Sequence, residues 1–330
     1  MTHVPVMLNE VLVALSPKAD DIIVDGTFGG GGYSLAILAA ADCQLYGIDR
    51  DLDAIARAEA MAADEPRLHP LFGRFGNLET VLRDAGVTAV DGIVLDIGVS
   101  SFQLDEDERG FSFMRDGPLD MRMGQSGPTA ADIVNSWSEA DLTQLIRALG
   151  EDRQAKRIAR AIARRRDEAP FETTLDLADT IETAVGGRRG QKTHPATQTF
   201  QALRMLANDE LGELGRALAA AERMLKPGGR LVVVCFHSLE DRIVKTFVRT
   251  HAGETSGGSR HRPVSEPGPA PSFTMPKRKA LEPSEQEIAA NPRARSAKLR
   301  LAIRTEAPAW ERPIDIGVSL PEAANQEATI

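Results

Sequence analysis

Ionisable side chains follow four short apolar runs of the sequence, at Asp25, Asp49, Asp96 and His237. A carboxylate can accept hydrogen bonds or take up a proton, and an imidazole can exchange a proton near neutral pH. Short apolar runs that alternate with helical patterns are typical of a parallel α/β sheet, in which ligands bind beyond the carboxyl ends of the strands. We therefore expect these four side chains to gather at one edge of a sheet and to form a site there.

A glycine-rich segment, DGTFGGGGYS over residues 25–34, follows the first predicted strand. Glycines allow the backbone to approach a ligand closely, and the helix predicted from Leu35 favours anionic groups at its N-terminus. The dinucleotide pattern G-x-G-x-x-G fails here at Ser34. The pattern of alternate glycines that binds S-adenosylmethionine fails at Thr27. The loop therefore leaves both classes of nucleoside cofactor open.

Two strand-end carboxylates narrow this choice. Asp49 can accept hydrogen bonds from both ribose hydroxyls of either cofactor, although Asp49-Arg50-Asp51 could instead be a charged surface turn. Asp96 follows the fourth predicted strand, where Rossmann-like methyltransferases carry polar catalytic groups. Together, these residues favour methyl transfer over hydride transfer.

A long irregular segment follows Asp96 and extends to Met123. It has no helical or strand period, but Phe102, Phe111 and Phe113 make it too apolar for a solvated linker. Irregular segments of this length that leave a core strand are commonly functional. We expect an ordered loop at the mouth of the site.

The sequence pattern becomes purely helical from about Thr129 to Asn208. We predict an α/β domain over residues 1–125 and 209–305, an all-helical insertion over residues 126–208, and a loose tail over residues 306–330. Pro227-Gly228-Gly229 is expected to end a helix and turn the chain back into the sheet. Residues 297–303 alternate as a closing strand.

The composition is ordinary for a globular protein, with 42% hydrophobic and 26% charged residues among 330. The longest apolar runs are too short to cross a bilayer, and the N-terminus has no export-signal pattern. Two cysteines, Cys43 and Cys235, cannot form a disulfide framework and fit a reducing cytoplasm. We expect a cytoplasmic protein with no membrane partner. Because no Cys/His cluster has metal-ligand spacing, no metal site is predicted.

Positive charge is concentrated in two segments although the net charge is −9. Residues 147–166 hold eight Lys and Arg against two acids, and residues 260–304 hold ten against four. Helical spacing places four arginines on one face of a helix, at Arg153, Arg157, Arg160 and Arg164. This face could contact RNA phosphates, or it could be a solvated face partly paired with nearby acids.

Several longer motifs resemble one known family. They read VDGTFGGGG (residues 24–32), LDIGVSSFQLD (95–105), RGFSF (109–113), GPLDMRM (117–123), HPATQTFQ (194–201), FHSLEDR (236–242) and NPRARS (291–296). In this order they resemble the bacterial ribosomal RNA small-subunit methyltransferase H family, also called MraW, over residues 3 to about 304.

The resemblance implies a Rossmann-like class I methyltransferase domain with a helical insertion. It implies S-adenosylmethionine as cofactor and N4-methylation of a decoding-region cytidine in small-subunit (16S) ribosomal RNA. The partner would be that RNA or the small ribosomal subunit, and members can form homodimers. The family's cofactor residues correspond to Gly31, Gly32, Tyr33, Asp49, Phe75, Asp96 and Gln103. Many relatives have histidine at the position of Tyr33. A cofactor contact through the backbone would tolerate this difference, whereas a contact through the side chain would be altered by it.

The resemblance leaves the catalytic base open. The exocyclic amine of cytosine is a poor nucleophile, so it must be aligned and its N–H must meet an acceptor. The Asp/Asn-Pro-Pro-aromatic tetrapeptide of many amino-methyltransferases is replaced by DIGV at residues 96–99. The candidate acceptors are Asp96, Ser100, Asp120, His237 and Ser238. Asp120 could instead pair with Arg115 or Arg122, and His237 could only order a helix start.

Three rival interpretations remain. Carbon methylation would need a thiolate, but Cys235 continues an apolar run and is expected to be an inert buried residue. A nicotinamide-dependent oxidoreductase is disfavoured by the failed dinucleotide pattern. A non-catalytic RNA-binding assembly factor is disfavoured by the intact glycine loop with Asp49 and Asp96.

Overall fold

The computed structural model describes residues 5–98, 106–124, 126–188, 190, 193–254, 268–321 and 324. Contacts divide the chain into two compact units. The sheet unit comprises Met1–Gly98 and Leu211–Ile316, and the helical unit comprises Val99–Glu210 and Gly317–Ile330. Among the helices of the described residues, none is both long and apolar enough to span a membrane.

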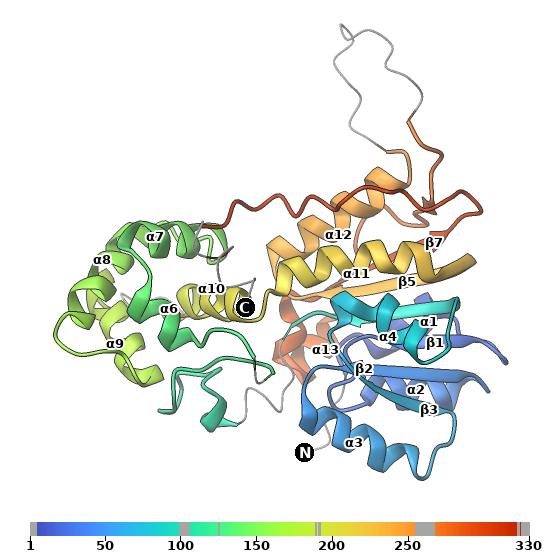
Figure 1. The fold of residues 1–330 in the computed structure, drawn as a ribbon, viewed down its shortest axis with the longest axis horizontal. Coiled ribbons are helices and arrows are strands. Elements are labelled where there is room, and N and C mark those ends of the chain that lie inside the picture. The colour runs from blue at the N-terminus through green and yellow to red at the C-terminus, as the bar shows by residue number, and fades with distance from the viewer. Residues whose placement is uncertain are drawn as a thin grey trace, which may run out of the picture. The chain divides into compact units, whose positions relative to one another are not determined.

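The sheet unit is built on seven strands in the order β3-β2-β1-β4-β5-β7-β6 (Figure 1). Their bounds are β1 Ile22–Asp25, β2 Gln44–Asp49, β3 Leu68–Phe72, β4 Val90–Asp96, β5 Leu225–Cys235, β6 Phe273–Thr274 and β7 Lys298–Arg304. The first five in this order are parallel, whereas β7 pairs antiparallel with β5 and β6. The predicted α/β class and the closing strand are confirmed. Because the strand order reverses between β1 and β4, the ligand-binding switch point lies at the ends of these two strands.

Seven α-helices and two short 3-10 helices accompany the described part of this sheet. They are α1 Leu8–Leu15, α2 Gly32–Ala40, α3 Leu52–Ala62, η1 Phe75–Asn77, α4 Leu78–Asp84, α11 Glu210–Met224, α12 Ser238–His251, α13 Glu285–Ala290 and η3 Pro292–Ser296. One core cluster joins Val11 and Leu15 of α1 and Ile37 of α2 to Val232 and Val234 of β5. Alternate residues of a strand point to the same face, so α1 and α2 cover one face of the sheet.

The expected turn at Pro227-Gly228-Gly229 is wrong. Helix α11 ends at Met224 and β5 begins at Leu225, before the Pro-Gly-Gly sequence. The β4–β5 register shifts instead: Val90 pairs with Leu225, but Gly92 pairs with Arg230. Gly228 has a φ of 83°, which glycine adopts without steric cost, so the sequence forms a bulge inside the strand.

The helical unit contains one short 3-10 helix and five α-helices within its described residues. They are η2 Asp107–Arg109, α6 Ala130–Ser136, α7 Glu139–Ala148, α8 Ala155–Arg166, α9 Thr174–Val185 and α10 Thr197–Ala207. The predicted boundary at residue 125 differs from this grouping. The Leu119 N–H donates to the Glu172 carbonyl and the Ala130 N–H to the Asp120 carbonyl, at 2.9 and 2.8 Å. These bonds join the described residues after β4 to the helices.

Two residues of the segment after residue 305, which was expected to be a loose tail, contact the sheet unit. The Trp310 indole stacks on His251 at 4.3 Å between ring centroids, and its Nε1–H donates to the Ala270 carbonyl at 2.9 Å. A Cβ built on Gly215 of α11 would lie 3.2 Å from Ile316. These contacts could not be predicted from the sequence, because they are made by single side chains and leave no repeating pattern of apolar residues.

Candidate functional site

The glycine loop between β1 and α2 is shaped by the protein's own packing. Gly31 caps α2 at a φ of 75°, and a Cβ there would lie 2.7 Å from the Phe28 ring. Phe28 in turn packs on Gly47 of β2, where an added Cβ would lie 2.6 Å from its ring. A side chain at Gly31 would therefore disturb the loop itself, whether or not it reached a ligand.

Asp49, at the end of β2, is tied into this loop. Its Oδ2 accepts the Gly29 N–H at 2.8 Å and its Oδ1 accepts the Asp51 N–H at 2.9 Å. Burial raises the pKa of Asp49, while the hydrogen bonds from the Asp51 and Gly29 amides oppose that rise. The Arg50 amide also lowers the pKa of this carboxyl. The two oxygens together offer about four lone-pair positions, so Asp49 still has capacity to accept a hydroxyl group.

Asp25 was expected at the strand-end edge, but it was not among the predicted cofactor-binding or catalytic residues. It is fully buried at the end of β1, where Oδ2 accepts the Ser34 hydroxyl at 2.7 Å and Oδ1 accepts the Thr27 N–H at 3.2 Å. Burial raises its pKa to about 6, and the charge of Asp49 adds to the rise. Ser34, nine residues after Asp25 in the same motif, was the signal in the sequence that could have indicated this role. Its hydroxyl can donate a hydrogen bond to a buried carboxyl.

Asp96 ends β4 beside this network. Its N–H donates to the Thr27 hydroxyl at 2.7 Å, which links the β4 end to the glycine loop. Its Oδ1 is screened from solvent and has no hydrogen-bond partner among the described residues. Burial raises the pKa of Asp96 well above its ordinary value, and the charges of Asp25 and Glu240 raise it further.

The carboxyl edge of the sheet therefore gathers acidic groups whose charged forms disfavour one another. Asp25, Asp49, Asp96 and Glu240 act on one another there. Over the part of the chain that the structure describes, no lysine or arginine hydrogen-bonds or pairs with Asp25 or Asp96. Such an edge stabilises a ligand that carries positive charge and repels one that carries phosphates.

The other predicted cofactor residues differ in which of their groups, backbone or side chain, could contact a ligand. Tyr33 is buried, and its hydroxyl donates to the Val6 carbonyl, so its side chain serves the core rather than the loop surface. Only the backbone of Tyr33 remains available to a ligand. A Cβ on Gly32 would lie 2.3 Å from Pro5. Phe75 begins η1, after the Gly73-Arg74 turn that follows β3. Gln103 lies outside the described residues.

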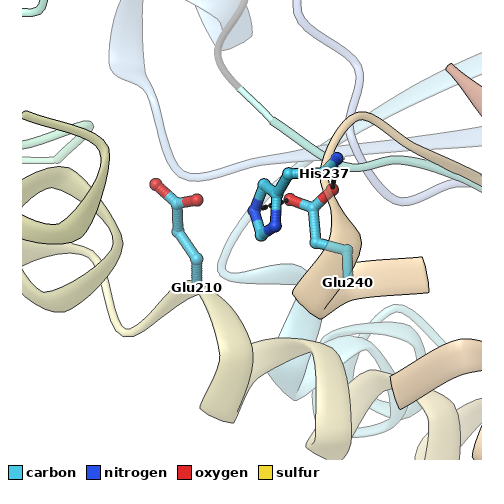
Figure 2. A group of neighbouring side chains, drawn as sticks. All are labelled: Glu210, His237 and Glu240. Atoms are coloured by element: carbon cyan, nitrogen blue, oxygen red, sulfur yellow. Dashed lines mark hydrogen bonds and ion pairs between the residues drawn. The ribbon is translucent and has the colours of Figure 1, made fainter. Parts of the chain in front are cut away.

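His237 follows β5 and is the N-cap of α12 (Figure 2). Its Nε2 lies 2.9 Å from Glu240 Oε1, although the angles there do not meet those of a hydrogen bond. Glu240 Oε2 accepts the N–H groups of Phe236 and His237 at 2.8 and 3.3 Å. Glu240 thus orders the helix start through backbone N–H groups, and the role of the His237 imidazole stays a prediction. Ser238 is the exposed first residue of α12.

Glu210, also drawn in Figure 2, is the first residue of α11. Both of its carboxylate oxygens accept hydrogen bonds from Arg204, each at 2.8 Å. This bidentate contact lies within the helical unit and satisfies the buried acid.

Asp120 belongs to the helical unit and pairs with Arg122, one of the two partners proposed from sequence. Arg122 Nε and Nη2 donate to its two oxygens, each at 2.8 Å. Burial acts to raise the pKa of Asp120, but the hydrogen bonds and charge of Arg122 outweigh it and hold the pKa below its ordinary value. An engaged carboxylate of low pKa is a poor proton acceptor. Ser100 lies outside the described residues.

The predicted basic face is present on α8. Arg157, Arg160 and Arg164 are exposed on this helix, and Arg153 is exposed just before it. Arg160 Nε lies 3.6 Å from Glu139 Oε1. The neighbouring Arg165 pairs with Asp176 at 2.7 Å. The face is thus partly paired, through the contact of Arg160 with Glu139.

Cys235 is buried at the end of β5, with 1% of its surface exposed. Burial raises the pKa of its thiol well above the ordinary value, and Glu240 and Asp241 add to the rise. A thiol held in this state is a poor nucleophile. The structure therefore supports the inert interpretation of Cys235.

Comparison with known proteins decides between the cofactor classes. Residues 1–305 match the family model described as the MraW methylase family. The chain belongs to the MraW methylase family. Ribosomal RNA small subunit methyltransferase H of Hyphomonas neptunium is 63% identical over 325 residues, covering 98% of this chain and 95% of the relative. Its namesake from Caulobacter vibrioides is 57% identical over 309 residues, covering 94% and 97%.

A solved structure of a putative rRNA methylase from Clostridium thermocellum is 13% identical, with a TM-score of 0.41 over 92% of this chain and 99% of that one. This likeness is too slight to carry an argument. Membership of the MraW methylase family confirms the predicted resemblance, makes the chain a methyltransferase and identifies S-adenosylmethionine as its methyl donor. The oxidoreductase alternative is not favoured.

Proposed function

We propose that this MraW-family enzyme transfers the methyl group of S-adenosylmethionine to N4 of a cytidine in the decoding region of small-subunit ribosomal RNA. The observation that carries the proposal is the cluster of buried carboxyl groups at Asp25 and Asp96, which a bound cation would favour in their ionised forms. S-adenosylmethionine carries a sulfonium cation, which these carboxyls would attract. The pyrophosphate of a dinucleotide would meet repulsion at the same place. The choice of small-subunit ribosomal RNA as the substrate is supported by the names of the two relatives.

The residues around the glycine loop fit the rest of this cofactor. Asp49 keeps acceptor capacity beside the hydrogen bonds it accepts from the loop amides, which suits a ribose hydroxyl. The first turn of α2, capped by Gly31, offers backbone N–H groups to the carboxylate of the methionine half. Gly32 and Tyr33 would contribute through backbone, and Phe75 would lie beside the base. Gln103 stays a prediction from the resemblance.

Asp96 is the proton acceptor that we favour for catalysis. When bound, the cofactor supplies an electrophilic methyl group; the chain must align the amine and accept its N–H. Asp96 Oδ1 is screened from solvent and has no partner among the described residues, so it is open to accept the amine N–H. Asp120 is weaker because Arg122 occupies both oxygens. His237 and Ser238 stay as alternatives at the start of α12, as does Ser100.

The helical insertion over residues 126–208 is proposed to contact RNA through the arginines of α8. Their exposure and their common face support this proposal. Because the substrate would be ribosomal RNA, we place the enzyme in the cytoplasm. Homodimer formation, implied by the resemblance, is a prediction that analytical ultracentrifugation would test.

The test is nucleoside mass spectrometry of small-subunit ribosomal RNA from a strain that lacks this gene, before and after the gene is restored. We expect N4-methylcytidine to decrease on deletion and to return with the wild-type gene but not with Asp96→Asn. Restoration by a variant that cannot bind S-adenosylmethionine would instead support the non-catalytic assembly factor.

A further inference from the structure

Glu213 is a buried acid of α11 that no sequence motif singled out. Its residue has no exposed surface. Its Oε1 accepts hydrogen bonds from Arg74 Nη1 at 2.9 Å and from Arg50 Nη1 at 3.3 Å. Burial raises the pKa of Glu213, while the charges of Arg50, Arg74 and Arg216 oppose the rise. One carboxylate oxygen thus holds two guanidinium groups inside the sheet unit.

The two arginines flank the residues proposed to hold the nucleoside. Arg50 directly follows Asp49, and Arg74 directly precedes Phe75. The loops that carry them are already joined once, because the Gly73 N–H donates to the Asp49 carbonyl at 2.9 Å. Glu213 adds a second connection, through side chains and from a different element.

The packing at η1 shows how closely α11 approaches these loops. A Cβ built on Gly76 would lie 3.0 Å from the Glu213 Cα and 3.2 Å from its carbonyl oxygen. Glycine at this position lets the Phe75–Asn77 turn lie directly against the helix backbone. The Glu213 carboxylate is therefore placed at a fixed distance from both loops.

We propose that Glu213 is a positioning residue for the nucleoside half of the cofactor, acting through Arg50 on Asp49 and through Arg74 on Phe75. The inference rests on the proposed cofactor roles of Asp49 and Phe75. The guanidinium groups of Arg50 and Arg74 contact the same oxygen of Glu213. If the negative charge of Glu213 were removed, these two positive groups would repel each other. Their repulsion would move the two loops apart and leave the strand-end acids Asp25 and Asp96 in place.

The test uses Glu213→Gln, which keeps the side-chain shape and removes the charge. The matched control is Glu79→Gln, because among the described residues the ion pairs of Glu79 are with Arg223 of α11 at 2.6 Å and with Arg83 at 3.0 Å, and neither arginine belongs to the loops of Arg50 and Arg74. Affinity for S-adenosylmethionine and for 5′-methylthioadenosine, which has only the nucleoside half, is measured by calorimetry. Methyl transfer gives kcat and KM, and melting of the free protein gives Tm.

We expect Glu213→Gln to weaken both ligands by the same factor of about ten, equal to about 1.4 kcal/mol. KM for S-adenosylmethionine should rise equally, with kcat at saturation and KM for RNA unchanged. Glu79→Gln should change none of these. A lower Tm with unchanged ligand affinity would mean that Glu213 is only structural and would overturn the proposal. So would a kcat loss without a KM change.

Arg74→Gln provides the test if Glu213→Gln does not fold, because the Arg74 side chain is 35% exposed and easier to replace. It should raise KM for S-adenosylmethionine and leave kcat unchanged; unchanged KM would count against the proposal. Failure of the wild-type protein to bind S-adenosylmethionine would contradict the proposed function itself. Normal binding by wild type and by both variants would contradict only the role of Glu213.

Discussion

At the scale of single residues, Asp25 makes the site sensitive to pH. It is fully buried, and its pKa is raised from 3.8 to about 6, first by burial and then by the charge of Asp49. A carboxyl that binds its proton more tightly in the folded protein than in the unfolded chain stabilises the folded protein at low pH. This stabilisation is complete below the pKa that the group has in the unfolded chain, and it is lost as the pH rises through the pKa that it has in the folded protein. The relevant window therefore runs from about pH 4 to about pH 6.

Asp25→Asn should remove this dependence, because an amide does not ionise. Between pH 4 and pH 6, the free energy of unfolding of wild type should fall by about 3 kcal/mol more than that of the variant. The reason is that a difference of one bound proton between folded and unfolded states changes this free energy by about 1.4 kcal/mol per pH unit. Urea denaturation at pH 4, 5, 6 and 7 measures both proteins. Parallel curves would mean that Asp25 is not protonated in the folded protein at low pH.

Asp49→Ala should weaken the binding of S-adenosylmethionine. Two ribose hydroxyls would lose a charged acceptor, which is worth about 1.5–3 kcal/mol for each hydrogen bond. The Gly29 and Asp51 amides would lose the same acceptor, so the loop should also lose order. Calorimetry on the folded variant checks the affinity. A dissociation constant within twofold of wild type would remove Asp49 from the site.

Cys235→Ser should keep substantial methyltransferase activity if the variant folds. The thiol is buried and its pKa is raised well above the ordinary value, so no thiolate is available for attack on a ring carbon. Methyl transfer to RNA is the measurement. Loss of activity with normal cofactor binding, or a covalent RNA adduct of the wild type, would support carbon methylation instead.

At the scale of elements, α8 is the proposed RNA contact. Replacing Arg157, Arg160 and Arg164 with Gln should reduce RNA affinity and flatten its salt dependence, because each phosphate contact releases counterions. Cofactor affinity should not change. A control that replaces Arg83, Arg223 and Arg249 of the sheet unit alters the net charge equally. If both triple variants bind RNA alike, the α8 face is only solvated.

The sheet was the most predictable part of the chain, because apolar runs that end in Asp25, Asp49 and Asp96 mark buried parallel strands directly. The closing strand was predictable from its alternation. The tertiary partners were not, since sequence spacing does not specify which side chains meet across elements. Glu213 reads as an ordinary helix acid until the fold brings Arg50 and Arg74 to it. The Pro-Gly-Gly bulge was missed because the same residues also form turns.

At the scale of the whole molecule, residues 306–316 belong to the sheet unit. The Trp310 ring covers His251, and the Trp310 backbone N–H donates to the buried Glu222 at 3.1 Å. Truncation after Thr305 should therefore lower Tm, because both buried groups would meet water. Cofactor affinity of the folded remainder should stay as in the full chain, since these residues are not part of the strand-end site. An unchanged Tm would show that the segment contributes nothing to stability.

The most direct test of the account is methyl transfer by the purified full-length protein. It is incubated with isotope-labelled S-adenosylmethionine and small ribosomal subunits from a strain that lacks the gene. The RNA is then digested for nucleoside mass spectrometry. The account predicts label in N4-methylcytidine from the decoding region, and none with Asp96→Asn. Label in 5-methylcytidine, or no label from a protein that binds the cofactor normally, would contradict it.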